Sequence, residues 1–258
     1  MNSTTHCSRS RHQAAAFTLA DLLAVLSVLA IGVALLTPAL ARTQPNSPAF
    51  QCFNNLRQLS HAWLIYADDN ADKLPHPNWN PPFVPGWLYD PSAASAPPDL
   101  LVAPYAANPV LAYQGGLLWS YVNQMSTYRC ALDNANTTHW KYRKNKLSTY
   151  LMNGAVCGYG IISYGNTYKL TDFRQDAFIM WEPDDISPSL GMNNYNDASS
   201  YPDPSSDFGL GQRHTKAKGI AATAGGGVEF VKYADWVKAS KDPNKNRVWC
   251  SPGSANGH

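Results

Sequence analysis

The sequence predicts an α+β protein in which a long N-terminal hydrophobic helix precedes a C-terminal head built on an antiparallel β-sheet. Three observations predict this class: an uncharged apolar run at 22–36, an amphipathic helical pattern at 50–66, and short apolar segments between turn residues in the second half. The expected parts are a leader at 1–16, a hydrophobic transmembrane helix at 17–41, a second amphipathic helix at 42–72, an α+β head at 73–240 and a tail at 241–258. The tail is expected to be loosely ordered except where Trp249 and Cys250 anchor it.

The first helix is predicted from hydropathy. Between Phe17 and Leu40 the only ionisable residue is Asp21, and about 20 apolar residues in a helix cross the hydrocarbon core of a bilayer. A signal peptide with small residues at 39–41 fits this segment, and so does a signal anchor whose basic leader stays cytoplasmic. Both interpretations leave Asp21 unexplained, because a carboxylate within an apolar span is costly.

The second helix is predicted from the spacing of its apolar side chains. Ser47 and Pro48 match an N-cap and a first helical position, and prolines before them separate this helix from the first. The apolar stripe consists of Phe50, Leu56, Leu59, Trp63 and Tyr66. Strands are expected farther along the chain at 148–152, 159–164, 177–182, 218–223 and 227–233.

Composition excludes two classes of protein. The 258 residues carry a formal net charge of +2, whereas a nucleic-acid-binding protein usually has a strongly basic face. Arg9 and Arg11 lie in the leader, which has no acidic residue, so the rest of the chain is formally neutral. A 45% hydrophobic share and a 12% aromatic share also argue against intrinsic disorder. We therefore expect a folded protein with no nucleic-acid partner.

The N-terminus resembles the type IV prepilin signature. A basic leader ends at Ala16, and Phe17-Thr18-Leu19, one further residue, Asp21 and an apolar helix follow. In that family a membrane peptidase cuts before the Phe, and the new amino terminus is then methylated. The acid at mature position five pairs with a neighbouring subunit's amino terminus and sets the register of the filament. This chain departs from the family in having Ala16 for the usual Gly and Asp21 for the usual Glu.

Later blocks resemble a large bacterial family of prepilin-type proteins with a closing His-x9-Asp-Gly motif. Cys52 opens a Cys-x-Asn-Asn-Leu-x-Gln-Leu helix, and the other matching blocks lie at 116–122, 128–130, 148–154 and 213–229. In the last block Gly225 and Gly227 replace the family's Asp and His. Glycine permits positive φ, so the stretch can still turn. Any ligand role of the missing Asp and His is lost.

The resemblance implies a non-enzymatic structural subunit of a type II secretion pseudopilus or a type IV pilus-like filament. Its partners would be prepilin peptidase, other pilin or pseudopilin subunits and the inner-membrane assembly platform. Before assembly it would be a single-pass inner-membrane protein with its head in the periplasm or at the cell surface. One alternative is a membrane-anchored extracytoplasmic binding module, for example for carbohydrate, that does not polymerise. Another is an anchored hydrolase.

An acidic group follows the strand expected at 177–182. Glu182, Asp184 and Asp185 offer oxygen ligands for a hard cation, and the major pseudopilins that this chain resembles use a C-terminal calcium loop. The expectation is no cofactor, with calcium at these three residues as the alternative. In the hydrolase alternative, Glu182 with Asp184 or Asp185 would be the acid pair. His214 is interpreted as a structural hydrogen-bonding residue, because no other histidine lies at ligand spacing from it.

Four cysteines remain once Cys7 is set aside with the leader. An even number outside the cytoplasm favours disulfides, and four cysteines allow three pairings. We favour Cys52–Cys130, which would tether the second helix to the head, and leave the pairings of Cys157 and Cys250 open. No two cysteines have Cys-x-x-Cys spacing, so the sequence does not predict zinc or thioredoxin-like chemistry.

Overall fold

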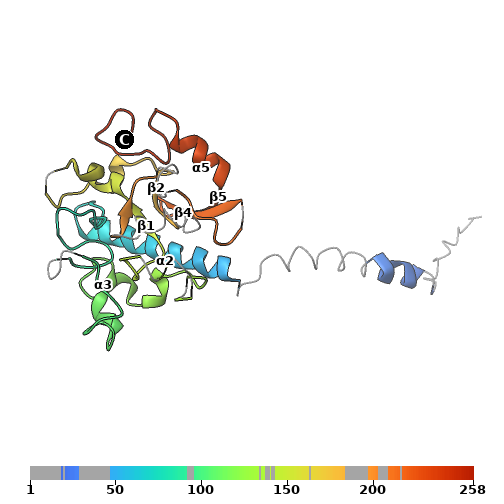
Figure 1. Ribbon diagram of the computed structural model, residues 1–258. Helices are drawn as coiled ribbons and strands as arrows, with labels where there is room; N and C mark the ends of the chain where they lie inside the picture. Colours follow the sequence, from blue (N-terminus) through green and yellow to red (C-terminus); the bar gives the residue numbers. More distant parts are fainter. Residues whose placement is uncertain are drawn as a thin grey trace, which may run out of the picture. The chain divides into compact units, whose positions relative to one another are not determined.

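The computed structural model describes residues 19, 21–28, 47–91, 96–133, 135–136, 140, 143–162, 164–183, 197–202, 209–215 and 217–258. The chain divides into two compact units, Met1–Pro45 and Asn46–His258. Residues 21–28 of the first unit are helical and exposed. The second unit contains a five-stranded sheet with helix α2 packed along it (Figure 1).

Helix α2 spans Pro48–Asp69 and confirms the predicted second helix. The hydroxyl of Ser47 accepts a hydrogen bond from the backbone N–H of Phe50 at 3.2 Å, and Pro48 occupies the first turn, where it removes no intrahelical hydrogen bond. One face of the helix is buried, as its apolar spacing requires. The buried residues are Cys52, Leu56, Leu59, Ser60, Ala62, Trp63 and Ala67.

The sheet has the strand order β3-β1-β2-β4-β5. Its strands are β1 (Leu151–Asn153), β2 (Phe178–Trp181), β3 (Ser199–Ser200), β4 (Lys218–Thr223) and β5 (Val228–Lys232). The pairs β1–β2, β2–β4 and β4–β5 are antiparallel, but β3 runs parallel to β1. The prediction of a purely antiparallel sheet is therefore wrong. The sheet is mixed because the chain returns after β2 to pair Met152 with Ser199 in the same direction.

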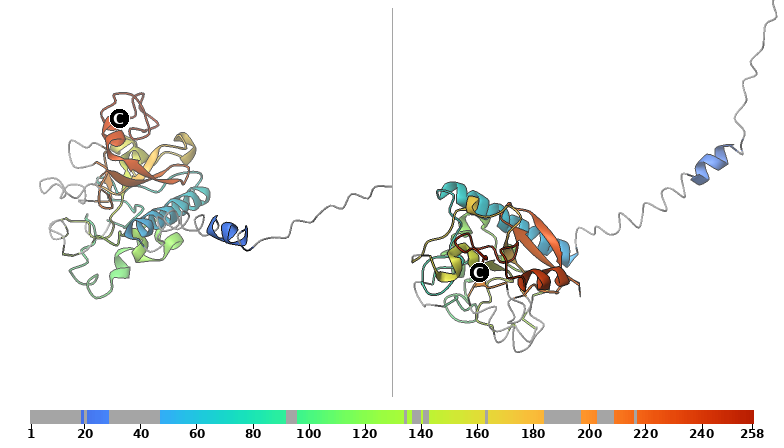
Figure 2. Two further views of the ribbon diagram at one scale, coloured as in Figure 1. Left: turned by 90° about the vertical axis from the view of Figure 1, so that its right-hand side faces the viewer. Right: turned by 90° about the horizontal axis from the view of Figure 1, so that it is seen from above.

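The two faces of the sheet bury different cores. Ile220 and Ala222 of β4 join α2 in the larger core, while Ala221 between them joins Trp236 of α5 (Tyr233–Ser240) in the smaller one. This alternation follows from the two-residue period of a strand. Figure 2 shows α2 and α5 on opposite sides of the strands. Strands covered on both faces are apolar throughout, which explains the short apolar runs of the sequence.

The remaining elements are short helices. These are η1 (Pro109–Ala112), α3 (Trp119–Val122), η2 (Met125–Tyr128), η3 (Gly154–Gly160) and η4 (Leu170–Asp172).

Most of the predicted strands are confirmed. The strands at 177–182, 218–223 and 227–233 agree with β2, β4 and β5 to within one residue at each end, and 148–152 overlaps β1. The strand at 159–164 is wrong, because η3 ends at Gly160 and residues 161–162 form a turn and a bend. The backbone is left-handed at Gly158 and Tyr159, with φ of 59° and 55°, and an extended strand cannot continue through that region.

Within the part of the chain that the structure describes, no helix is both long and apolar enough to cross a membrane. The described helical residues of the apolar segment lie between 19 and 28 and rise about 15 Å, against a hydrocarbon core of ~30 Å. This finding corrects three predictions: the long hydrophobic stem, the transmembrane or signal-anchor helix, and the single-pass inner-membrane location. The rest of the helix predicted at 17–41 lies outside the described residues.

The C-terminal tail packs against the rest of the second unit at residues 248–250. Val248, Trp249 and Cys250 are buried, and the indole N–H of Trp249 donates to the carbonyl of Ser240 at 2.7 Å. The side-chain amide of Asn153 donates to the carbonyls of Phe178 and Val248 at 2.9 and 3.1 Å. The tail is therefore joined to the core of the second unit at residues 248–250, which include the two residues, Trp249 and Cys250, expected to anchor it.

Candidate functional site

Four side chains that are far apart in the sequence meet inside the second unit. The Sγ atoms of Cys52 and Cys130, a carboxylate oxygen of Glu182 and a ring nitrogen of His214 all lie within 4.8 Å of one another. We refer to these four residues as the Cys-Cys-His-Glu cluster. Cys52 is on α2, Cys130 follows η2, Glu182 follows β2, and His214 lies in the segment before β4.

Backbone hydrogen bonds fix the segments that carry the cluster. The backbone N–H of Cys130 donates to the hydroxyl of Thr149 at 2.9 Å. The backbone N–H of Glu182 donates to Ile220 of β4 at 3.1 Å, and its carbonyl accepts from Gly211 at 2.7 Å. The sheet thus holds both Glu182 and the start of the segment that leads to His214.

A single nitrogen lies at the centre of the cluster. Nε2 of His214 is 3.4 Å from Sγ of Cys130 and 3.2 Å from Oε2 of Glu182. The other carboxylate oxygen of Glu182 accepts a hydrogen bond from Nη1 of Arg213 at 3.0 Å. The side chains of Glu182 and His214 are 0% and 2% exposed, and both cysteines are buried. The cluster is closed to solvent.

The titration of these groups reflects their mutual contacts. Burial lowers the pKa of His214, but its contacts with Cys130 and Glu182 outweigh burial and raise it to about 9. Burial raises the pKa of Glu182, but the positive charge of Arg213 and the contacts with His214 and Cys130 bring it below its ordinary value. The neighbouring thiol of Cys52, together with burial, raises the pKa of Cys130. Cys130 is therefore a protonated thiol at neutral pH when no cation is bound.

This arrangement is unsuited to nucleophilic catalysis. In a catalytic triad the nucleophile and the acid contact opposite nitrogens of the imidazole, so that the acid orients the base. Here Cys130 and Glu182 both face Nε2 of His214. A reactive cysteine also needs a depressed pKa and access to substrate, and Cys130 has neither. The donor set is instead one that can coordinate a metal ion.

The predicted site residues have different outcomes. Asp21 is exposed in the helical residues 21–28, while Ala16 and Phe17 lie outside the described part of the chain. Glu182 is buried beside sulfur and nitrogen donors. Asp184 and Asp185 lie outside the residues that the structure describes, so a calcium site at these three residues stays a prediction. The four cysteines, Cys52, Cys130, Cys157 and Cys250, are all buried free thiols in the structure.

The sequence indicates the members of the cluster but not that they meet. From the sequence alone Cys52 is expected to pair with Cys130, Glu182 is a calcium candidate, and His214 is a structural hydrogen-bonding residue. The available signal is that three of the four, Cys52, Cys130 and His214, lie in separate blocks of the family resemblance. Spacing rules search for ligands close together in the chain, and these ligands are brought together only by the sheet.

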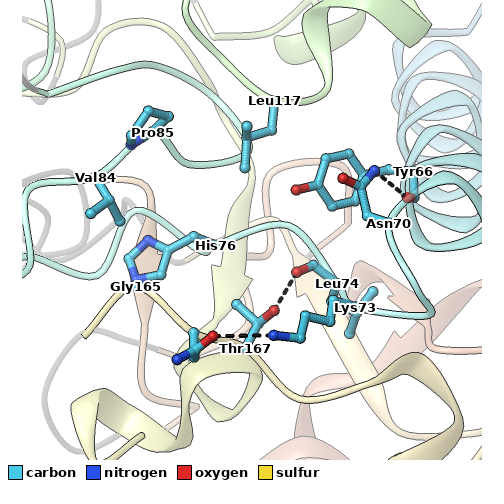
Figure 3. A pocket seen from close by; sticks show the side chains of 11 residues that line it. Tyr66, Asn70, Lys73, Leu74, His76, Val84, Pro85, Leu117, Gly165 and Thr167 are labelled. Atoms are coloured by element: carbon cyan, nitrogen blue, oxygen red, sulfur yellow. Dashed lines mark hydrogen bonds between the residues drawn. The ribbon is translucent and has the colours of Figure 1, made fainter. Parts of the chain in front are cut away.

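A pocket of about 370 Å³ lies at the C-terminal end of α2 (Figure 3). Nζ of Lys73 at its edge donates to the side chain of Asn166 at 3.1 Å. Burial lowers the pKa of His76 to about 4, so this imidazole is neutral at pH 7. None of the described residues that line the pocket is a carboxylate. The pocket can therefore bind a small polar molecule through the amide, hydroxyl and amino groups of its described lining.

No family model matches this chain, and comparisons with curated proteins and with solved structures gave no significant match. The resemblance to prepilins therefore stays a prediction from the residues quoted above.

Proposed function

We propose that this protein is a non-enzymatic structural subunit that assembles into a pilus-like or pseudopilus-like filament through its apolar N-terminal segment. The observation that carries this proposal is the exposure of apolar side chains in the described part of that segment. An apolar helix with no polar face is stable only when apolar partners cover it. The exposed side chains are Leu19, Leu22, Leu23, Val25, Leu26 and Val28, between 48% and 74% exposed.

The polar residues of this segment are compatible with burial between subunits. The hydroxyl of Ser27 lies 2.9 and 2.8 Å from the carbonyls of Leu23 and Ala24, so its hydrogen bond is made within its own helix. The carboxylate of Asp21 needs a cationic partner once it is buried. We propose that this partner is the amino terminus of a neighbouring subunit, created when prepilin peptidase cuts before Phe17.

The head supports a structural role. Its cluster of chemically capable side chains is closed to solvent, and the described lining residues of the pocket at the end of α2 include no carboxylate. A compact unit of this kind can present a surface to other subunits or to secreted partners without catalysing a reaction.

The test combines protein mass with filament incorporation. Mass spectrometry of the chain from its native host should show an amino terminus at methylated Phe17. Asp21→Ala should lose incorporation into sheared, pelleted filaments, Asp21→Glu should retain it, and the matched control Asp68→Ala, at an exposed position on α2, should behave as wild type. An intact Met1, a cut after Ala41, or undiminished incorporation of Asp21→Ala would overturn the proposal.

A second candidate function, binding of a small polar ligand such as a saccharide, is favoured by the pocket in Figure 3. Tyr66 offers an aromatic face and Asn70 an amide at its wall. Glycan-array binding that is lost in Tyr66→Ala and kept in Tyr164→Ala, an exposed tyrosine that does not line this pocket, would support this function. Equal glycan binding by both variants would exclude the pocket as the binding site.

A further inference from the structure

We propose that the Cys-Cys-His-Glu cluster is a tetrahedral zinc site that ties helix α2 to the sheet. Two thiolates, one imidazole nitrogen and one carboxylate oxygen are all ordinary zinc ligands, and structural zinc sites have four protein ligands. The four donors come from four separate segments of the second unit. This inference concerns the head alone and is independent of the proposed filament assembly.

The spacing of the donor atoms matches a tetrahedron around one ion. Zinc binds sulfur at ~2.3 Å and nitrogen or oxygen at ~2.0–2.2 Å, so neighbouring ligands in a tetrahedral site are ~3.3–3.8 Å apart. Nε2 of His214 lies 3.4 Å from Sγ of Cys130 and 3.2 Å from Oε2 of Glu182, and no pair of donor atoms is more than 4.8 Å apart. A small adjustment of side chains would bring all four to bonding distance of a central cation.

Hydrogen bonding alone leaves the cluster incomplete. Nε2 of His214 can donate at most one proton, yet both a thiol and a carboxylate face it. Oε2 of Glu182 is buried, and its contact with that nitrogen is a 3.2 Å ion pair. A buried carboxylate oxygen that shares one donor with a thiol is poorly compensated. A cation at the centre, taking the place of the proton on Nε2, would contact this oxygen, the imidazole nitrogen and the thiols at once.

The charges also balance around a divalent ion. Two thiolates and the carboxylate of Glu182 carry three negative charges, and zinc with the guanidinium of Arg213 carries three positive ones. Arg213 binds the far oxygen of Glu182 at 3.0 Å, which orients the near oxygen toward the cluster as outer-shell partners of metal ligands do. A neutral assembly is the form that a buried site tolerates.

The donor types select the metal. Soft thiolates with an imidazole favour zinc over calcium or magnesium, which prefer oxygen ligands. All four positions come from the protein and the site is closed to solvent, which is typical of structural zinc sites. We therefore assign zinc a structural role: it would stabilise the second unit by linking α2, through Cys52, to the segments that carry Cys130, Glu182 and His214.

The first measurement uses the full-length wild-type chain, purified from zinc-supplemented medium without reductant or chelator. We expect about one zinc per chain by elemental mass spectrometry. Removal of the metal should lower the Tm, and readdition of zinc alone should restore it. Substitution with Co²⁺ should give the visible absorption of a tetrahedral thiolate site.

The matched variants separate cluster residues from other buried cysteines. Cys130→Ser and His214→Ala should lose zinc, whereas Cys157→Ser and Cys250→Ser, buried cysteines outside the cluster, should keep it. Wild-type chain that holds no zinc would overturn the proposal whether or not the variants fold. A Cys52–Cys130 disulfide in peptides alkylated before denaturation would overturn it as well, in favour of a covalent tether at the same place.

Discussion

At the scale of single residues, Asp133 and Arg143 form a buried bidentate ion pair near the cluster. Nη1 and Nη2 of Arg143 reach the two carboxylate oxygens of Asp133 at 2.9 and 2.5 Å, and both side chains are 1% exposed. The hydroxyl of Thr149 donates to the same carboxylate at 2.7 Å and accepts from the backbone of Cys130. The pair therefore supports the loop that carries Cys130.

We predict that Arg143→Met lowers the free energy of unfolding by about 3–5 kcal/mol, because it leaves the charge of Asp133 buried without its partner. Urea unfolding measures the loss. The control is Arg174→Met, which breaks an exposed pair with Asp176 and should cost under about 1 kcal/mol. Equal small losses for both variants would show that Asp133 finds another partner or is protonated in the folded state.

A second residue-scale prediction concerns Asp197. Burial raises its pKa to about 6, although Ser199 donates to its carboxylate. The folded state therefore holds the proton more tightly than the unfolded state, and the stability that comes from this group is full below pH 3.8 and is lost as pH rises through about 6.

Asp197→Asn should accordingly be more stable than wild type at pH 8, by up to about 3 kcal/mol, because the amide is neutral and keeps an oxygen for Ser199. The difference in unfolding free energy should shrink toward zero below about pH 4. Denaturant unfolding of both proteins across this range tests it, and a difference that does not change with pH would show that the carboxyl does not titrate as described.

At the scale of elements, the β4–β5 hairpin turns at three consecutive glycines, Gly225 to Gly227. The backbone of Gly226 has a φ of 82°, and its N–H donates to Thr223 at 2.9 Å. The hydroxyl of Ser60 on α2 donates to the carbonyl of Gly226 at 2.9 Å. The glycine stretch around Gly226 therefore forms a turn, as the sequence predicts, and the turn is joined to α2.

Gly226→Ala should destabilise the protein by about 1–2 kcal/mol, because an L-residue is strained at this positive φ and its Cβ would lie 2.7 Å from Cδ1 of Leu64. Gly227→Ala is the control, since the backbone there is not left-handed and the nearest atom is Oγ1 of Thr223 at 3.2 Å. Thermal unfolding of the two variants should rank Gly226→Ala as the less stable, and the reverse order would contradict the turn geometry.

Local sequence pattern predicts most of the helices and strands around the cluster, but not how they pair. Helix α2 follows from the spacing of Leu56, Leu59 and Trp63, and β2 and β4 follow from apolar runs, because local periodicity determines which face is buried. Strand β3 is only two serines long and has no periodic signal. Its parallel pairing with β1 is a tertiary contact, as is the meeting of the four cluster residues, so neither was predictable from local pattern.

At the scale of the whole molecule, the two compact units differ in what they bury. The second unit, Asn46–His258, contains both hydrophobic cores, while the described apolar side chains of the first are exposed. We predict that a fragment of residues 46–258 folds alone with a Tm close to that of the full chain and no longer assembles. Calorimetry and filament pelleting test the two statements, and a fragment without a cooperative transition would contradict the first.

The packing of the tail has a consequence for biosynthesis. The backbone N–H of Phe178 on β2 donates to the carbonyl of Arg247 at 2.7 Å, and Asn153 on β1 reaches Val248. Two central strands are thus completed by residues that the ribosome adds well after the strands themselves. The head can close only after residues 247–250 have emerged, and a chain truncated before residue 247 would leave the backbone N–H of Phe178 without this partner.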